Sequence, residues 1–112
     1  MKVCRSIWKE IKEQAVTPKV KRRVIAGEKI MLVLYEMELG AASSIHHHPH
    51  EQFGYVLQGK LRFFLGKEEK LLSAGDVYHV PPNMKHGGEV VGDKTVILLD
   101  VFHPIREDFL KK

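Results

Sequence analysis

The chain has 112 residues, of which 44% are hydrophobic and 29% are charged, with a formal net charge of +4 and a single cysteine. This size allows one globular domain over residues 1–112, and Cys4 alone excludes an internal disulfide. No apolar run reaches the roughly 20 residues of a membrane span, and the N-terminus lacks the apolar segment of a secretory signal, so we expect a cytoplasmic protein with no membrane partner.

The first part of the chain is predicted to precede the main fold. Ser6–Val16 is compatible with a short helix or an irregular arm, and Lys19–Arg23 is the densest basic stretch. A nucleic-acid binder usually clusters such charge on one face and interleaves stacking aromatics. Here the other basic residues are scattered among acidic ones, so we interpret the stretch as a solvated strand edge. We expect no nucleic-acid partner, and the surplus positive charge favours an anionic small molecule.

Short apolar stretches then alternate with Gly, Pro, Asn and Asp, which is typical of an all-β domain. After Pro104, Ile105–Leu110 is predicted to form one helical turn. So many short strands suit a jelly roll, which limits free sheet edges. The expected fold is therefore an all-β jelly roll with a short N-terminal arm and a C-terminal helical turn. The predicted strands are Arg22–Ala26, Lys29–Leu39, Ser44–His46, Phe53–Gln58, Lys60–Leu65, Lys70–Leu72, Asp76–Val80, Lys85–Glu89 and Thr95–Phe102.

Side-chain alternation predicts that the last strand is largely apolar on both faces. One face carries Val96, Leu98, Asp100 and Phe102, and the other carries Ile97, Leu99 and Val101. A second apolar stripe, on the face opposite Gln52, consists of Phe53, Tyr55 and Leu57. One face must line the interior, so the other is expected to pack on an arm or on a second subunit. We therefore expect a homodimer.

Histidine is concentrated in the middle of the chain. Five of the seven histidines are His46, His47, His48, His50 and His86. In an extended chain His46 and His48 point the same way, and Gln52 has the same parity. Imidazole nitrogen and amide oxygen suit Fe, Ni, Mn, Co, Cu or Zn. The run alone fits a metal site and a polar loop equally well.

The spacing of these residues resembles the two motifs of the cupin superfamily, over roughly residues 29–102. The first cupin motif places a Gly, His-x-His, a Glu and a second Gly at fixed spacing, and this chain has Gly40, His46, His48, Gln52 and Gly59 there. The second motif places a Gly, Pro-x-Gly and a His, and this chain has Gly75, Pro81, Asn83 and His86. The resemblance implies a double-stranded β-helix barrel at about residues 22–102. It also implies one divalent metal held by His46, His48, Gln52 and His86.

Three residues depart from the family pattern. Gln52 replaces Glu, Asn83 replaces Gly, and Val90 stands where the second motif usually has a terminal Asn. Asn tolerates left-handed turns, so Asn83 is a mild change. Glu51 has the wrong parity to replace Gln52 as a ligand, so we favour the side-chain oxygen of Gln52. Three neutral imidazoles and a neutral amide leave the ion's charge unbalanced, which predicts a strong Lewis acid and disfavours Fe(III).

The C-terminal strand and its extension carry a second candidate group: Asp100, Phe102 and Arg106. Asp100 is either a surface carboxylate or a buried proton carrier. Arg106 either grips a substrate carboxylate through two parallel hydrogen bonds or forms a salt bridge with Glu107 or Asp108. The residues alone leave both alternatives open.

This ending, together with the histidine run, resembles the pectin-degradation cupins that linearise unsaturated monouronates. The resemblance implies that Asp100, Phe102 and Arg106 are catalytic and that the substrate is a small sugar acid, which would place the protein in carbohydrate metabolism. Fold alone also allows a dioxygenase, a sugar isomerase, or a module that binds a small ligand without catalysis.

Overall fold

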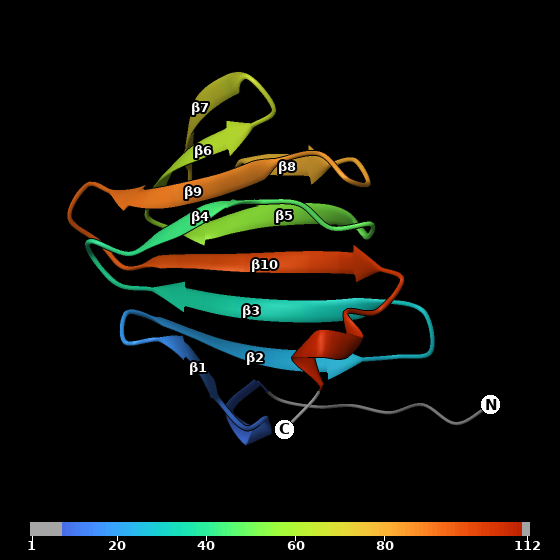
Figure 1. Cartoon of the computed structure of the whole chain (residues 1–112). Helices are drawn as coiled ribbons and strands as arrows, with labels where there is room; N and C mark the ends of the chain where they lie inside the picture. Colours follow the sequence, from blue (N-terminus) through green and yellow to red (C-terminus); the bar gives the residue numbers. More distant parts are fainter. Residues whose placement is uncertain (1–7, 111–112) are drawn as a thin grey trace.

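The computed structural model describes residues 8–110, which form two antiparallel β-sheets (Figure 1). The six-stranded sheet runs in the order β1 (Gln14–Thr17), β2 (Val20–Ala26), β3 (Met31–Met37), β10 (Val96–His103), β5 (Glu51–Gln58) and β8 (Val77–Val80). The four-stranded sheet runs β4 (Ala42–His46), β9 (His86–Val91), β6 (Lys60–Leu65) and β7 (Glu68–Ser73). Two 3-10 helices, η1 (Trp8–Glu10) and η2 (Glu107–Phe109), flank the strands. The predicted all-β jelly-roll class is confirmed.

The N-terminal part differs from the expectation. Of the segment predicted as a helix or arm, residues 6 and 7 lie outside the described residues, and the rest contains η1 and the short strand β1. β1 pairs with β2, so the sheet begins before residue 22 and β2 is not an edge strand. A tight turn reverses the chain, with Lys19 N donating to Thr17 Oγ1 at 3.2 Å. The expected solvated edge at Lys19–Arg23 is therefore wrong, because β1 covers it.

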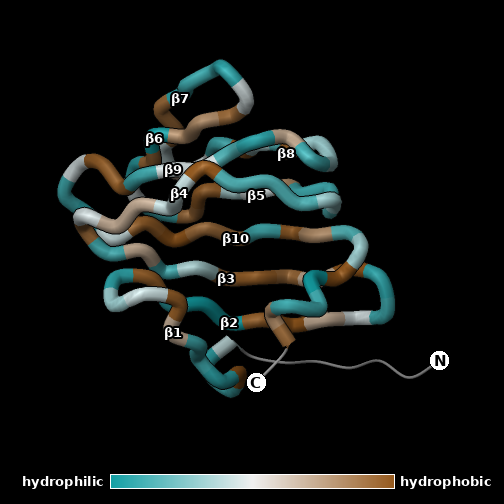
Figure 2. The backbone as a smooth tube through the Cα atoms, in the orientation of Figure 1, coloured by the Kyte–Doolittle hydropathy of each residue, from teal (hydrophilic) through white to brown (hydrophobic). Residues whose placement is uncertain are grey.

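Alternating burial along β10 divides the core into two clusters. Leu98 belongs to the larger cluster, which fills the space between the sheets together with Val56, Leu61 and Val80. Phe102 belongs to a smaller cluster that includes Phe109 of η2. Hydrophobic residues are accordingly prominent along β3 and β10 (Figure 2). Asp100 points to the same side, between the two clusters, so a buried carboxylate separates two apolar regions.

No helix among residues 8–110 is long and apolar enough to cross a membrane.

Candidate metal centre

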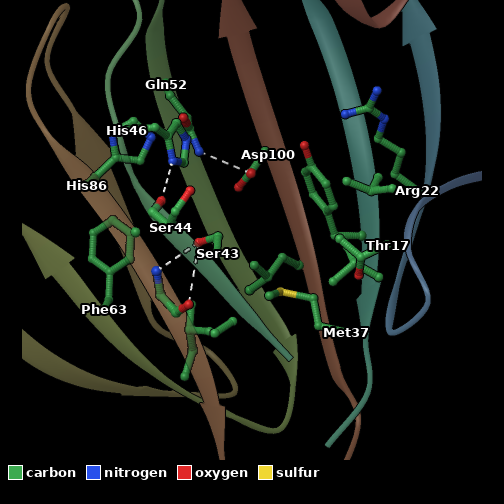
Figure 3. A pocket seen from close by; sticks show the side chains of 18 of the residues that line it. Thr17, Arg22, Met37, Ser43, Ser44, His46, Gln52, Phe63, His86 and Asp100 are labelled. Atoms are coloured by element: carbon green, nitrogen blue, oxygen red, sulfur yellow. Dashed lines mark hydrogen bonds between the residues drawn. The ribbon is translucent and has the colours of Figure 1, made fainter. Parts of the chain in front are cut away.

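Three histidines converge at one end of the interior. His46 ends β4 and is paired in register with His86, which begins β9, whereas His48 lies in the connection from β4 to β5. Each offers one ring nitrogen, and these atoms all lie within 4.8 Å of one another. His48 and His86 are buried and His46 is exposed. Figure 3 shows His46 and His86 side by side with Gln52 next to them.

Hydrogen bonds fix the same tautomer in all three rings. Each Nδ1 lies within hydrogen-bond distance of a backbone carbonyl, which can only accept, so Nδ1 carries the proton and Nε2 keeps a lone pair. Burial lowers the pKa of His48 to about 4 and also lowers the pKa of His86, so both rings are neutral at neutral pH. The distances are 2.8 Å from His46 to Ser44 O, 3.0 Å from His48 to His50 O, and 2.8 Å from His86 to Met84 O.

A cation fits this arrangement of lone pairs. His86 Nε2 is buried and has no hydrogen-bond partner. Leaving a buried polar atom unpaired is costly, and a metal ion bound to Nε2 removes that cost. Imidazoles whose other nitrogen donates to a carbonyl are the usual ligands of such ions. The three histidines could therefore hold one divalent metal.

Gln52 of β5 faces the same point. It is buried, and its Oε1 lies 3.1 Å from His48 Nε2. Because the tautomer leaves no proton on His48 Nε2, two acceptors face each other there, which a shared cation would relieve. Glu51, the alternative that the sequence offered, is exposed on the other side of the strand, where His79 Nε2 lies 2.7 Å from its carboxylate. Of the two residues, only Gln52 can reach the histidines.

Asp100 lies next to Gln52 and is fully enclosed. Its Oδ2 accepts a hydrogen bond from Gln52 Nε2 at 3.1 Å, and its Oδ1 accepts one from the hydroxyl of Tyr78 at 2.6 Å. Burial raises the pKa of Asp100 to about 7, against the opposing effects of those two hydrogen bonds and of the Arg106 charge. The sequence predicted no role for Tyr78, because nothing in its local pattern distinguishes it from other strand aromatics.

Phe102 and Arg106 lie on the same side of the centre. The ring of Phe102 is 5.7 Å from that of His48 and packs edge-on against Phe109. The Arg106 guanidinium lies 4.2 Å from the centre of the Phe109 ring and is bound by Asp108 through two hydrogen bonds of 3.2 and 2.9 Å. Arg106 thus both lines the cavity and forms the salt bridge that the sequence allowed.

A cavity of about 550 Å³ is lined by His46, His86, Gln52, Asp100, Phe102 and Arg106, and also by Arg22, to which the sequence interpretation gave no role in the site. Arg22 of β2 lines it, with its guanidinium 3.8 Å from the centre of the Phe109 ring. Figure 3 shows Arg22 across the cavity from His46 and His86. Its parity with Val20 and Val24 was the available signal, since alternate residues of a strand share a face. The cavity therefore has imidazole lone pairs at one side and the Arg22 guanidinium at the other, and Arg106 also lines it.

Comparison with known proteins identifies the family. A family model described as a cupin domain matches residues 33–102. The chain belongs to the cupin family. It is 31% identical to an RmlC-like cupin from Shewanella frigidimarina, over 93% of each chain, with a TM-score of 0.86. It is also 31% identical to KdgF from Halomonas sp., over 92% of this chain and 96% of that one, with a TM-score of 0.84.

A more distant similarity shows only the fold. A predicted oxalate decarboxylase from Thermotoga maritima is 17% identical over 88% of this chain and 97% of that one, with a TM-score of 0.79. No curated protein matches the sequence.

The turn in the second cupin motif also holds the loop that carries His48 in place through a backbone hydrogen bond. Asn83 adopts a left-handed conformation with φ of 65°, as its place in the motif predicted. In that conformation its backbone N donates to His48 O at 2.7 Å. The turn that leads to His86 is thereby tied to the loop that carries His48, so the positions of these two histidines are linked through the backbone.

Proposed function

We propose that this cupin is a metal-dependent enzyme that acts on a small sugar acid and opens the ring of a 4,5-unsaturated uronate to give the linear α-keto acid. The observation that carries the proposal is the contact between Asp100 and Gln52, because Gln52 in turn lies next to His48 and so connects a buried carboxylate to the histidine cluster. The resemblance of the C-terminal motif to pectin-degradation cupins and the 31% identity to KdgF support this substrate class.

The reaction is an isomerisation that needs no oxidant. The hydroxyl at C1 loses a proton and becomes an aldehyde as the bond from C1 to the ring oxygen breaks. The ring oxygen becomes the ketone at C5, and the former double bond takes a proton at C4. A divalent ion held by His46, His48, His86 and Gln52 would supply Lewis-acid polarisation of a substrate oxygen. Asp100 takes the first proton and returns one to carbon, as a buried carboxylate can do.

The arginines account for an anionic substrate. Asp108 engages Nε and one Nη2 hydrogen of Arg106, and Arg has five donors, so Nη1 remains available to a carboxylate. Asp108 then orients the guanidinium rather than blocking it. Arg22 adds a second positive charge within the cavity. Phe102 forms an apolar wall whose ring centre lies 5.3 Å from the Arg106 guanidinium and 5.7 Å from the His48 ring.

The test is loss of the ultraviolet absorbance of the substrate's double bond. Metal-loaded protein should remove this absorbance, and Asp100→Asn should slow the loss by roughly 10²- to 10⁴-fold, the usual contribution of a positioned proton-transfer group. Asp93→Asn makes the same change in an exposed turn and should leave the rate unchanged. An absorbance that falls no faster than in a control without enzyme would reject the uronate as substrate.

One observation favours a second candidate, a cupin that binds a small acid without turning it over. Both oxygens of Asp100 already accept hydrogen bonds, which suits a structural carboxylate as well as a proton carrier. This candidate predicts that the uronate binds at equilibrium with constant absorbance. It also predicts that Asp100→Asn alters that affinity little, whereas Arg106→Gln weakens it.

A further inference from the structure

Tyr78, Gly54 and Asp100 form one row across three neighbouring strands. The register pairs Gly54 of β5 with Tyr78 of β8 on one side and with Asp100 of β10 on the other. Residues paired in this way point to the same face of a sheet. Because the middle residue has no side chain, the ring of Tyr78 can cross β5 and bring its hydroxyl to Asp100 Oδ1, 2.6 Å away.

Gly54 is needed for space rather than for backbone conformation. Its φ lies outside the left-handed region, so its backbone suits any residue. A Cβ at this position would overlap the ring and the hydroxyl of Tyr78. Even alanine would therefore force the tyrosine away from Asp100.

The row controls which end of the Gln52 amide faces the histidines. Asp100 Oδ2 accepts from Gln52 Nε2 at 3.1 Å, which leaves Gln52 Oε1 3.1 Å from His48 Nε2. An amide can rotate and exchange its oxygen and nitrogen, but the ionised Asp100 carboxylate, whose two oxygens both accept hydrogen bonds here, has no proton to donate and so selects the nitrogen. An amide nitrogen turned toward the histidines would have no lone pair to offer a metal.

We propose that Tyr78 is a positioning residue for the metal centre. Its hydroxyl holds the Asp100 carboxylate, the carboxylate holds the Gln52 amide with its oxygen toward the imidazoles, and Gly54 leaves room for the contact. The inference rests on the proposed role of Gln52 as a metal ligand and is independent of the substrate. Without the hydroxyl the carboxylate is free to turn, and the amide loses its fixed orientation.

The test is the affinity of full-length protein for Co²⁺, measured by competition with a chelator and by the visible absorption of bound cobalt. Tyr78→Phe removes only the hydroxyl and keeps the ring stacked on Phe63, with centroids 4.3 Å apart. Loss of an outer partner usually weakens metal binding 10- to 100-fold, and since Tyr78 acts through Asp100 we expect about 10-fold. The cobalt spectrum should also change, because the oxygen ligand is no longer fixed.

Tyr35→Phe is the matched control. Tyr35 is another tyrosine that lines the same cavity; it is partly buried, and among residues 8–110 no hydrogen bond joins its hydroxyl to Asp100. This variant should keep the affinity and the cobalt spectrum of the wild type. A Tyr78→Phe protein indistinguishable from Tyr35→Phe in both measurements would overturn the inference.

Gly54→Ala disrupts the same contact between Tyr78 and Asp100, because its Cβ fills the space that the Tyr78 ring occupies. It should weaken cobalt binding as Tyr78→Phe does, and the double variant should lose no more than either single variant, because both changes break one contact. Additive losses of cobalt affinity in the double variant would show that the two substitutions do not act through the same contact. If Gly54→Ala does not fold, the comparison of the two tyrosine variants decides alone.

Gln52→Ala separates this inference from the proposed ligand set. Weaker cobalt binding in Gln52→Ala but not in Tyr78→Phe would overturn only the positioning role. Wild-type binding in Gln52→Ala would remove Gln52 as a ligand and the inference with it. Since none of these measurements uses a sugar acid, failure of the uronate assay leaves their outcome unaffected.

Discussion

At the scale of single residues, the imidazoles are oriented by backbone carbonyls and not by acidic side chains. Each Nδ1 has a carbonyl partner within 3.0 Å. A carbonyl fixes the tautomer without adding negative charge. The charged side chains among the cavity's lining residues are Asp100, Arg22 and Arg106. A neutral ligand set would leave a bound ion strongly electrophilic.

Tyr35 should lower the free energy of unfolding as the pH rises into the alkaline range. Burial, together with the nearby Asp100 charge, raises its pKa to about 12 against the opposing effects of Arg22 and Arg106; Tyr78 is the other titratable group nearby. Well below pH 10 the tyrosine is protonated in both the folded and the unfolded chain, so it does not make the free energy of unfolding depend on pH there. Between about pH 10 and 12 only the unfolded chain loses the proton, so stability falls by roughly 2 to 3 kcal/mol.

Urea unfolding at pH 9 and at pH 11 measures this effect. Wild type should lose more stability between the two pH values than Tyr35→Phe, because the variant lacks the titrating hydroxyl. Tyr78, whose pKa is also raised by burial, contributes a loss that both proteins share. An equal loss in the two proteins would contradict the assignment to Tyr35.

At the scale of elements, the turn between β8 and β9 stabilises the end of the molecule that carries the histidines. Asn83 is left-handed there, a conformation that costs most residues about 1 to 2 kcal/mol and costs glycine little. Asn83→Ala should therefore lower the free energy of unfolding by about 1 kcal/mol. Asn83→Gly, the matched control, should stay near wild type. Equal losses in the alanine and glycine variants would show that the side chain, and not the conformation, matters.

Strand parity predicted the inner face of β10, and motif spacing predicted the convergence of His46, His48 and His86, because both signals are local or follow a known spacing. β1 escaped prediction because it is a short strand whose last three residues are exposed, so pairing with β2 rather than its own pattern defines it. The contact of Tyr78 with Asp100 also escaped, because it depends on β8, β5 and β10 being neighbours. Pairings between distant parts of the chain leave no mark in local composition.

At the scale of the whole molecule, the outer face of the six-stranded sheet presents a continuous apolar surface. Val77, Tyr55 and Leu99 form one row across β8, β5 and β10, and Phe53 and Val101 lie in the next. Phe53 is 54% exposed and Val77 is 64% exposed. Contiguous apolar surface of this kind usually marks an interface, and one surface can pair with its own copy about a two-fold axis.

We propose that this face, defined by Phe53, Tyr55, Leu57, Val77, Leu99 and Val101, joins two copies of the chain. Light scattering during gel filtration should give twice the chain mass, and Phe53→Glu should give the mass of one chain. Leu71→Glu is the matched control, since Leu71 is 60% exposed on β7 of the other sheet. A wild-type mass equal to one chain would remove the dimer.

Elemental analysis of untagged protein, followed by titration with Co²⁺, tests most directly whether His46, His48 and His86 hold a metal. Wild type should bind about one divalent ion per chain, as expected for a single site with this ligand set. His86→Ala should bind far more weakly while keeping the β-rich circular dichroism spectrum. A metal-free wild type that also fails to bind added Co²⁺, or a folded His86→Ala that binds it equally well, would contradict the metal centre.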